Sequence, residues 1–390
     1  MPLPTCFEFE CPVKTHCGDR ALENIAFEMR AMNAVKPLII GDEPAAQEKR
    51  LVPVLNAFKN AEMTLGVVEA IPVEDPASVA AQLAAIYRDK DCDAIVAVGQ
   101  GPFIDMAKWL NLMVSTGEEN PDAFIEGKGI PRSLRPLAVI PSATADGLEL
   151  SGYVRLQGKT LRSVNLMPPL LFLDPRSVGQ PGDVALAETG LTALTLALEA
   201  MFTADANPMD VVYARTAAKL AAMGLNGLAG DSEIGGPLSL TVAHAAALAG
   251  CTLGAGPQPL AFKLGWAVAE TGKISAAQAM GVMLSYVLEH RLAANEMPAD
   301  MLLELLDSAG RYARTPEGQR GAAGLQLLRD LLNRLFETTD GKIRRTLSDS
   351  GLSLQDVTEA TEGISAQGKG NASGGQETII TCAWEGRPIR

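Results

Sequence analysis

Short apolar runs alternate with amphipathic stretches over the first 175 residues of this chain. Five of the runs have the length and composition of buried strands, and they lie at residues 36–42, 61–71, 93–101, 135–147 and 168–175. Between them, residues 76–92 and 102–115 carry apolar side chains at helical spacing, and Pro102 suits the first turn of a helix. Strands that alternate with helices are typical of βαβ units, so the pattern predicts a parallel sheet.

After about residue 180 the pattern becomes one of helices alone. Ala and Leu dominate, β-branched runs disappear, and helical periodicity continues from residue 188 to about residue 338. A segment rich in Pro and Gly, residues 175–184, separates the two parts. Because 390 residues exceed what one hydrophobic core usually organises, we expect an α/β domain over residues 1–180 and an all-α domain over residues 181–390.

The last stretch, residues 365–390, is Gly-rich and polar and becomes briefly β-like at residues 377–384. This pattern leaves two alternatives open, a mobile tail or a strand that joins a sheet elsewhere.

Charge and composition narrow the classes of function. The chain has 33 Lys plus Arg against 46 Asp plus Glu, a formal net charge of -13, which argues against nucleic acid or an anionic membrane as the main partner. Its six cysteines include no C-x-x-C pair, so neither a zinc ribbon nor a disulfide scaffold is supported. We find no secretory leader pattern and no uncharged apolar run of membrane-spanning length, and therefore expect a cytoplasmic protein. Only three histidines occur, His16, His244 and His290.

A glycine-rich turn follows the strand predicted at residues 93–99. Gly99, Gln100 and Gly101 stand where the strand gives way to a helix, so backbone N–H groups and the helix N-terminus converge on one spot that attracts phosphate. Taken alone, the same residues also fit an ordinary strand-to-helix turn.

Two other strand ends carry polar side chains of the kind that bind a dinucleotide. Ser142 and Thr144 follow the run at residues 135–141, and their hydroxyls suit a pyrophosphate or a ribose, although such residues also cap loops. Asp42 closes the run at residues 36–42, where an acid accepts hydrogen bonds from an adenosine ribose and disfavours a 2′-phosphate; its alternative role is a helix N-cap. Three such loops at one edge of a sheet form a crevice, so together they predict a dinucleotide site that prefers NAD over NADP.

The order of these segments resembles the iron-containing, or group III, alcohol dehydrogenase family, and more distantly dehydroquinate synthase and the glycerol dehydrogenases. The resemblance covers roughly residues 7–295 and is carried by residues 92–108, 135–151, 167–175 and 188–200. It implies a Rossmann-like, dehydroquinate synthase-like α/β domain followed by the helical domain, and a homodimer or larger homo-oligomer.

The resemblance also implies roles for individual residues. Gly99, Gly101 and Asp105 would face the pyrophosphate, and Asp42 would face the adenosine ribose. Ser142 and Thr144 would lie near the phosphates and the nicotinamide half, and Lys159 would match a further lysine that contacts the cofactor.

The family holds iron or zinc with one Asp and three His in the cleft between its domains. The matching positions in this chain are Thr192, Leu196, Gln258 and Ala276. A hydroxyl, a leucine, a neutral amide and an alanine do not make a first shell for a divalent transition metal. No pair of the three remaining histidines has i, i+4 spacing, so we expect no bound metal.

Without a Lewis acid, another group must polarise the carbonyl and supply the proton. The candidates near the positions matched to metal ligands are Lys263, Thr192, Thr195 and Gln258. Lys263 is the only strong charge stabiliser among them, and its alternative is an ordinary surface lysine.

These observations predict an NAD(P)-dependent oxidoreductase that acts on a small alcohol, aldehyde or ketone without a metal. Two alternatives remain open. One is a catalytically silent relative that binds a dinucleotide, and the other resembles the maleylacetate reductases, relatives thought to reduce anionic unsaturated keto acids without a metal.

Overall fold

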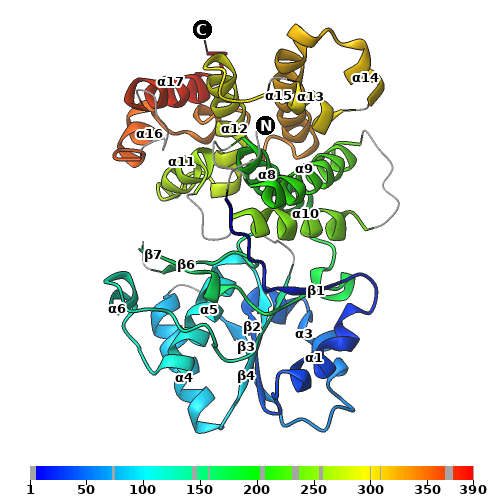
Figure 1. Cartoon of the computed structure of the whole chain (residues 1–390), viewed down its shortest axis with the longest axis vertical. Helices are drawn as coiled ribbons and strands as arrows, with labels where there is room; N and C mark the ends of the chain where they lie inside the picture. Colours follow the sequence, from blue (N-terminus) through cyan, green and yellow to red (C-terminus); the bar gives the residue numbers. More distant parts are fainter. Residues whose placement is uncertain are drawn as a thin grey trace. The chain divides into compact units, whose positions relative to one another are not determined.

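The computed structural model describes residues 6–72, 75–142, 147–156, 159–202, 207–230, 237–253, 258–298, 300–307, 309–364 and 372–389. The chain divides into two compact units (Figure 1). The α/β unit comprises Phe9–Pro181 with Leu253–Gly256, and the helical unit comprises Gly182–Thr252 and Pro257–Arg390 with Met1–Glu8. The predicted order of a parallel α/β part followed by a helical part is confirmed.

The α/β unit is built on a six-stranded parallel sheet with the order β1-β8-β5-β4-β2-β3. Four of its strands are buried at every position, which explains why they stand out in the sequence as continuous apolar runs. The strands are β1 (Lys14–Cys17), β2 (Pro37–Asp42), β3 (Gly66–Ile71), β4 (Ala94–Gly99), β5 (Leu137–Pro141) and β8 (Leu170–Leu173).

Helices cover both faces of this sheet. Figure 1 shows α1 (Ile25–Ala31) and α3 (Leu51–Ala57) on one side, and α4 (Pro76–Asp89) and α5 (Gly101–Thr116) on the other. Alternate strand residues such as Val96 pack against α1 and α3 in one core. The shorter helices of the unit are α2 (Glu43–Gln47), α6 (Pro121–Ile125) and α7 (Pro175–Val178), with 3-10 turns η1 (Ala21–Asn24) and η2 (Val164–Leu166).

Several of these helices begin at an acidic or amide side chain followed by proline. Asp42, Asp75, Asn120 and Asp174 each accept a hydrogen bond from a backbone N–H of the helix that follows, with Pro in its first turn. This local chemistry explains why α2, α4, α6 and α7 start directly after strands and turns.

An antiparallel hairpin follows β5, formed by β6 (Tyr153–Leu156) and β7 (Lys159–Arg162). The sequence pattern did not predict it, because each strand has only four residues and both contain charged side chains.

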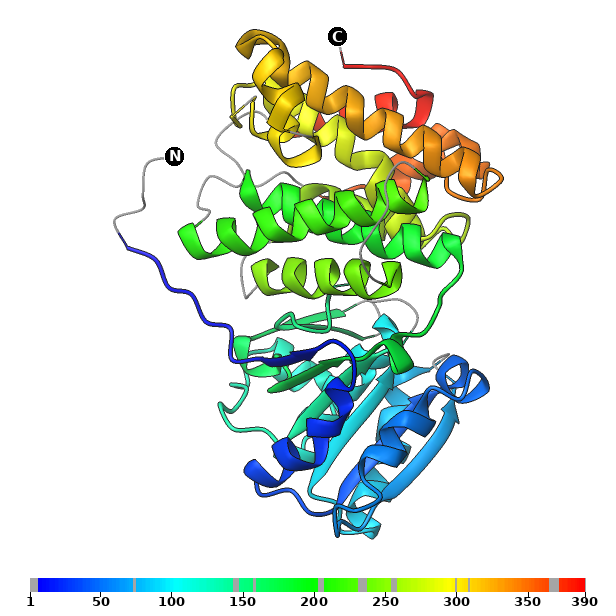
Figure 2. The same ribbon diagram turned by 90° about the vertical axis from the view of Figure 1, so that its right-hand side faces the viewer.

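The helical unit carries its longest helices in α8 (Asp183–Met201), α9 (Pro208–Leu228), α12 (Ala276–Ala293) and α15 (Arg320–Thr338). Figures 1 and 2 show α8 and α9 side by side. The other helices are α10 (Leu238–Leu253), α11 (Leu260–Ala269), α13 (Met301–Leu306), α14 (Ala309–Arg314), α16 (Leu354–Ala360) and α17 (Ala372–Glu385), with η3 (Glu317–Gln319) and η4 (Ser348–Ser350).

Helix α8 is long and apolar enough to cross a membrane by length and composition alone. In the structure, 78% of its most apolar stretch is buried, which is the property of a core helix.

The C-terminal segment corrects a prediction. Residues 377–384, expected as a strand or as part of a tail, lie in α17. Ile379, Ile380 and Ala383 are buried against α12, and their i, i+1, i+4 spacing marks one helical face. The two adjacent isoleucines suggested a strand, but tertiary burial of this face outweighs their β propensity.

The homo-oligomer and the cytoplasmic location stay predictions.

Candidate functional site

Three loops meet at the carboxyl edge of the parallel sheet. Strands β2, β4 and β5 are neighbours, and their register pairs Gly41 with Val98 and Gly99 with Pro141. Asp42, Gln100 and Ser142 therefore follow the strand ends side by side, and the N–H of Ser142 donates to the main-chain oxygen of Gly99 at 3.0 Å. The structure thus brings together the residues from which the sequence predicts a crevice.

The Asp42 carboxylate joins two of these loops. Its Oδ1 accepts from the N–H of Ala45 at 2.8 Å as the N-cap of α2, and its Oδ2 accepts from the N–H of Gln100 at 2.9 Å. The residue is 2% exposed, and burial raises the pKa of its carboxyl while the two N–H donors oppose that rise. The N-cap alternative is therefore what the structure shows, and the ribose contact stays a prediction.

The Gly99 to Gly101 turn opens the 16-residue helix α5. The side chain of its N-cap residue, Gln100, makes no capping hydrogen bond, and the exposed N–H groups of a helix N-terminus attract anions. A Cβ on Gly99 would lie 2.4 Å from Cδ1 of Phe103 and 2.8 Å from Oδ2 of Asp42. Glycine is thus required for the close contact between the two loops.

Ser142 carries a buried hydroxyl at the end of β5. The residue is 1% exposed, and its Oγ has no hydrogen-bond partner among the described residues. A buried hydroxyl without a partner costs about 1–3 kcal/mol, so such groups usually have a ligand or water. A phosphate or ribose oxygen at this strand end would satisfy it. Thr144 lies outside the described residues, and for Lys159 only the main chain, in β7, is described.

Asp105 and Lys108, on α5, face the segment that follows β5. Arg155 on β6 has its Nε 3.5 Å from Oδ2 of Asp105. The Nζ of Lys108 donates to the main-chain oxygens of Leu148, Ser151 and Tyr153 at 2.5, 2.9 and 3.3 Å. Sequence reasoning missed this role, although a charged pair three residues apart on an otherwise apolar helix was its signal. The contact of Asp105 with a pyrophosphate stays a prediction.

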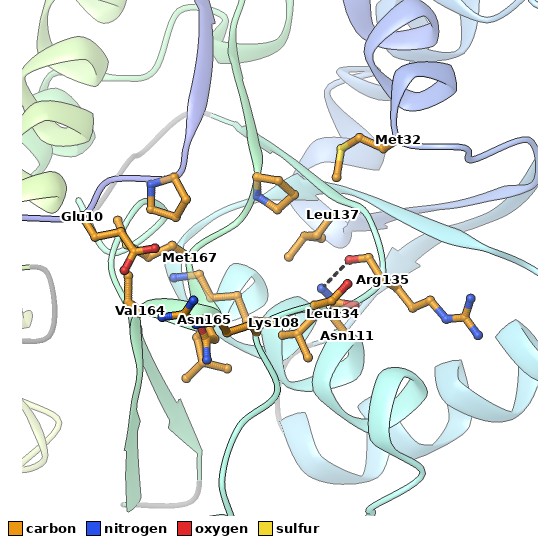
Figure 3. A pocket seen from close by; sticks show the side chains of 15 residues that line it. Glu10, Met32, Lys108, Asn111, Leu134, Arg135, Leu137, Val164, Asn165 and Met167 are labelled. Atoms are coloured by element: carbon orange, nitrogen blue, oxygen red, sulfur yellow. Dashed lines mark hydrogen bonds between the residues drawn. The ribbon is translucent and has the colours of Figure 1, made fainter.

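A separate cavity of about 280 Å³ lies at the amino ends of β5 and β8, where Leu137 and Pro169 line it. Figure 3 shows Asn111 in its wall, where the side-chain amide donates to the main-chain oxygen of Arg135 at 3.0 Å. This is the edge of the sheet opposite to Ser142, and none of the predicted cofactor residues is among the described residues that line the cavity.

The four positions that the resemblance matches to metal ligands lie in the helical unit. Thr192 and Leu196 are buried one turn apart on α8, Gln258 lies just before α11, and Ala276 is the first residue of α12. Across the described part of the chain, no three His, Cys, Asp or Glu side chains gather as a metal site requires. The donor set at these positions does not fit iron or zinc.

The three histidines of the chain lie away from these four positions in the sequence. His16 on β1 stacks on Phe172 with 4.9 Å between ring centroids and lies 3.1 Å from the Glu28 carboxylate. His244 is in α10, where burial lowers its pKa, and His290 is in the last turn of α12.

Two glycines near these positions allow close helix packing. A Cβ on Gly190 of α8 would lie 2.6 Å from Leu225 of α9, and one on Gly265 of α11 would lie 2.8 Å from the backbone nitrogen of Met280. These glycines allow the helices to approach closely whether or not a metal is bound.

Lys263 lies on α11 and is partly buried. Burial lowers the pKa of its ammonium group, while the negative charge of Glu199 opposes that change. Lys263 is thus not a fully solvated surface lysine.

Comparison with known proteins agrees with the fold. The family model for iron-containing alcohol dehydrogenase matches residues 12–175. The probable alcohol dehydrogenase EutG of Salmonella typhimurium is 27% identical over 207 residues, 51% of this chain and 52% of that protein. Maleylacetate reductase 2 of Cupriavidus pinatubonensis is 26% identical over 320 residues, 82% of this chain and 81% of that protein. The chain thus spans about half the length of the first of these relatives.

Solved structures share the fold over nearly the whole chain. An iron-containing alcohol dehydrogenase from Thermococcus thioreducens gives a TM-score of 0.80 at 20% identity, covering 97% of this chain and 100% of that one. A sulfoacetaldehyde reductase from Bifidobacterium kashiwanohense in complex with NAD+ gives 0.78 at 19% identity, covering 97% and 98%. The sequence resemblance is confirmed over residues 12–175, which match the family model for iron-containing alcohol dehydrogenase.

Proposed function

We propose that this protein is an NAD(P)-dependent oxidoreductase that interconverts a small alcohol with its aldehyde or ketone, and that it works without a resident transition metal. The observation that carries the proposal is the carboxyl edge of β2, β4 and β5. There the start of α5, whose N-cap side chain makes no capping hydrogen bond, lies beside the buried Ser142 hydroxyl, which has no hydrogen-bond partner among the described residues. The match to a dehydrogenase family and the likeness to a chain solved with NAD+ support it.

The α/β unit binds the dinucleotide in this proposal. Gly99, Gln100 and Gly101 present the start of α5 to the pyrophosphate, and the Ser142 hydroxyl donates to one of its oxygens. Asp42 places a carboxylate beside this loop, which disfavours the additional 2′-phosphate of NADP. When bound, the dinucleotide supplies or accepts the hydride.

The helical unit supplies the groups that handle the proton. Lys263 holds a proton that it donates to the carbonyl oxygen of the substrate during reduction, and its lowered pKa makes it a better donor at neutral pH. Gln258 and Thr192 donate hydrogen bonds to the same oxygen, in place of a Lewis acid. No step requires a metal, in keeping with the donor set at the former ligand positions.

A cofactor titration tests the binding half of the proposal. NADH and NADPH are added separately to the wild-type protein, and binding is followed by the change in nicotinamide fluorescence. We expect saturable binding with a lower Kd for NADH. Saturation by neither cofactor would overturn the proposal, and a lower Kd for NADPH would remove the role given to Asp42.

A second candidate is a maleylacetate reductase-like activity on an anionic unsaturated keto acid. The observation in its favour is the extent of the match to maleylacetate reductase 2, which covers 82% of this chain. Turnover of NADH with unsaturated keto acids but not with neutral aldehydes would select this candidate.

A third candidate is a relative that binds a dinucleotide and has lost catalysis. Its support is the replacement of all four ligand positions by Thr192, Leu196, Gln258 and Ala276. Saturable NADH binding without turnover of any substrate class would select it.

A further inference from the structure

A completely buried carboxylate joins three helices of the helical unit. Glu199, near the end of α8, is 0% exposed. Its Oε1 accepts from the N–H of Leu260 at 3.1 Å, and its Oε2 accepts from the N–H of Ala261 at 2.7 Å. Arg291 of α12 lies 3.5 Å from Oε1. Glu199 thus contacts the start of α11 and the last turn of α12.

The start of α11 needs this carboxylate because the helix cannot cap itself. Its N-cap residue is Pro259, which has no side-chain acceptor, so the first N–H groups of the helix have no local partner. Glu199 satisfies two of them from a different helix and places a negative charge at the positive end of the helix dipole.

Arg291 completes the arrangement. Besides its ion pair with Glu199, it donates from Nη1 to the main-chain oxygen of Phe202, the C-cap of α8, at 3.0 Å. The Glu199 carboxylate therefore pairs with the Arg291 guanidinium and accepts from the start of α11, and Arg291 also donates to the end of α8. Removing the carboxylate charge weakens the acceptor on which these donors depend.

We propose that Glu199 is a positioning residue that fixes the first turn of α11 and, with it, Gln258 and Lys263 on either side of that turn. The inference rests on the proposed function, because it assigns Glu199 to the alignment of the groups that handle the proton. A displaced first turn would move the Lys263 amine and the Gln258 amide away from the reacting oxygen, and small misplacements of such groups are costly in rate.

The chain offers a matched control. Glu289 of α12 also accepts from an arginine, Arg329 at 2.7 Å, and from a backbone N–H, that of Ile389 at 2.9 Å. It makes these contacts with α15 and the C-terminal segment rather than with the start of α11. Glu199→Gln and Glu289→Gln therefore each remove a carboxylate that pairs with an arginine and a backbone N–H, fully buried at Glu199 and 16% exposed at Glu289.

The experiment measures kcat and the KM for NADH in the two variants and the wild type, below the unfolding temperature of all three. We expect Glu199→Gln to lower kcat by about tenfold or more and to change the KM for NADH by less than about twofold. Glu289→Gln should change neither kcat nor this KM by more than about twofold. A Glu199→Gln kcat within about twofold of the wild type, or equal losses in both variants, would overturn the inference.

A second measurement does not depend on turnover. The rate at which an N-hydroxysuccinimide ester acetylates Lys263 is read by mass spectrometry in the same proteins, and on Glu199→Asp if the Gln variant does not fold. A change of about threefold or more confined to the Glu199 variant supports the inference, and an unchanged rate overturns it. If the wild type turns over no substrate, the proposed function has failed, and the acetylation rate alone decides on Glu199.

Discussion

The ammonium group of Lys108 donates a hydrogen bond of 2.5 Å to the main-chain oxygen of Leu148, a residue that lies 40 positions further along the chain. Two further main-chain oxygens, those of Ser151 and Tyr153, accept from the same nitrogen. Helix α5 therefore does more than present its N-terminus at the Gly99 to Gly101 turn. It also holds the segment that follows β5 and Ser142.

The first prediction concerns this lysine. Lys108→Met keeps the length of the side chain but leaves three main-chain oxygens without their donor. Because Lys108 is 1% exposed, we expect the free energy of unfolding to fall by about 2–4 kcal/mol, as measured by urea denaturation. Lys128→Met is the control, since the exposed Lys128 pairs with Glu118 and lies over the Phe124 ring at the surface, and it should change stability little. Equal effects of the two substitutions would contradict the role of Lys108.

The second prediction separates stability from cofactor binding at Ser142. Since the Ser142 hydroxyl has no hydrogen-bond partner in the part of the chain that the structure describes, Ser142→Ala should leave the unfolding temperature unchanged or slightly higher. The Kd for NADH should nevertheless rise by about tenfold or more, because a hydrogen bond to a charged phosphate contributes about 1.5–3 kcal/mol. Ser285→Ala, at a buried serine of α12, serves as the control and should leave the Kd unchanged. An unaltered Kd in Ser142→Ala would show that this hydroxyl does not face the cofactor.

The third prediction concerns the choice between NAD and NADP. Asp42→Asn removes the negative charge beside the phosphate-binding loop, so the ratio of the Kd for NADPH to that for NADH should fall by about tenfold. Because burial raises the pKa of Asp42, the wild type should also lose part of its discrimination as the pH falls toward that raised pKa and the carboxylate is protonated. A ratio that is the same in both proteins would leave Asp42 with its capping role alone.

The fourth prediction tests the close approach of two loops. Gly99→Ala places a methyl group 2.4 Å from the ring of Phe103 and 2.8 Å from Asp42, so one of them must move. We expect a loss of about 1–3 kcal/mol in stability and weaker NADH binding, measured by thermal denaturation and titration. Gly129→Ala meets no atom within 4 Å and should be neutral in both measurements.

The parts of the fold that sequence predicted are those with a strong local signal. Strand β4 is a continuous apolar run, Ala94–Gly99, that ends in glycine, and α5 follows with proline in its first turn. The β6–β7 hairpin has no such signal, because Tyr153–Leu156 and Lys159–Arg162 are short and mix charged with apolar residues. In α17 the signal was misleading, since Ile379 and Ile380 are adjacent and only their burial against α12 shows that they lie on a helix.

Only part of the candidate site could be predicted from the sequence. Strand ends in a parallel sheet share one edge, so the grouping of Asp42, Gln100 and Ser142 follows from topology alone. The partners of Lys108 and Glu199 are main-chain atoms distant in the sequence, and no pattern of side chains marks a main-chain acceptor or donor. These two residues therefore emerge only from the structure.

The activity proposed for this chain is hydride transfer with NAD(H) and without a transition metal. The most direct measurement is NADH oxidation with a panel of small aldehydes and ketones, on protein dialysed against EDTA and shown by mass spectrometry to carry no iron or zinc. We predict saturable turnover whose rate changes by less than about twofold when either metal is restored. Turnover that appears only after iron or zinc is added and bound, or no turnover with or without metal, would contradict the account.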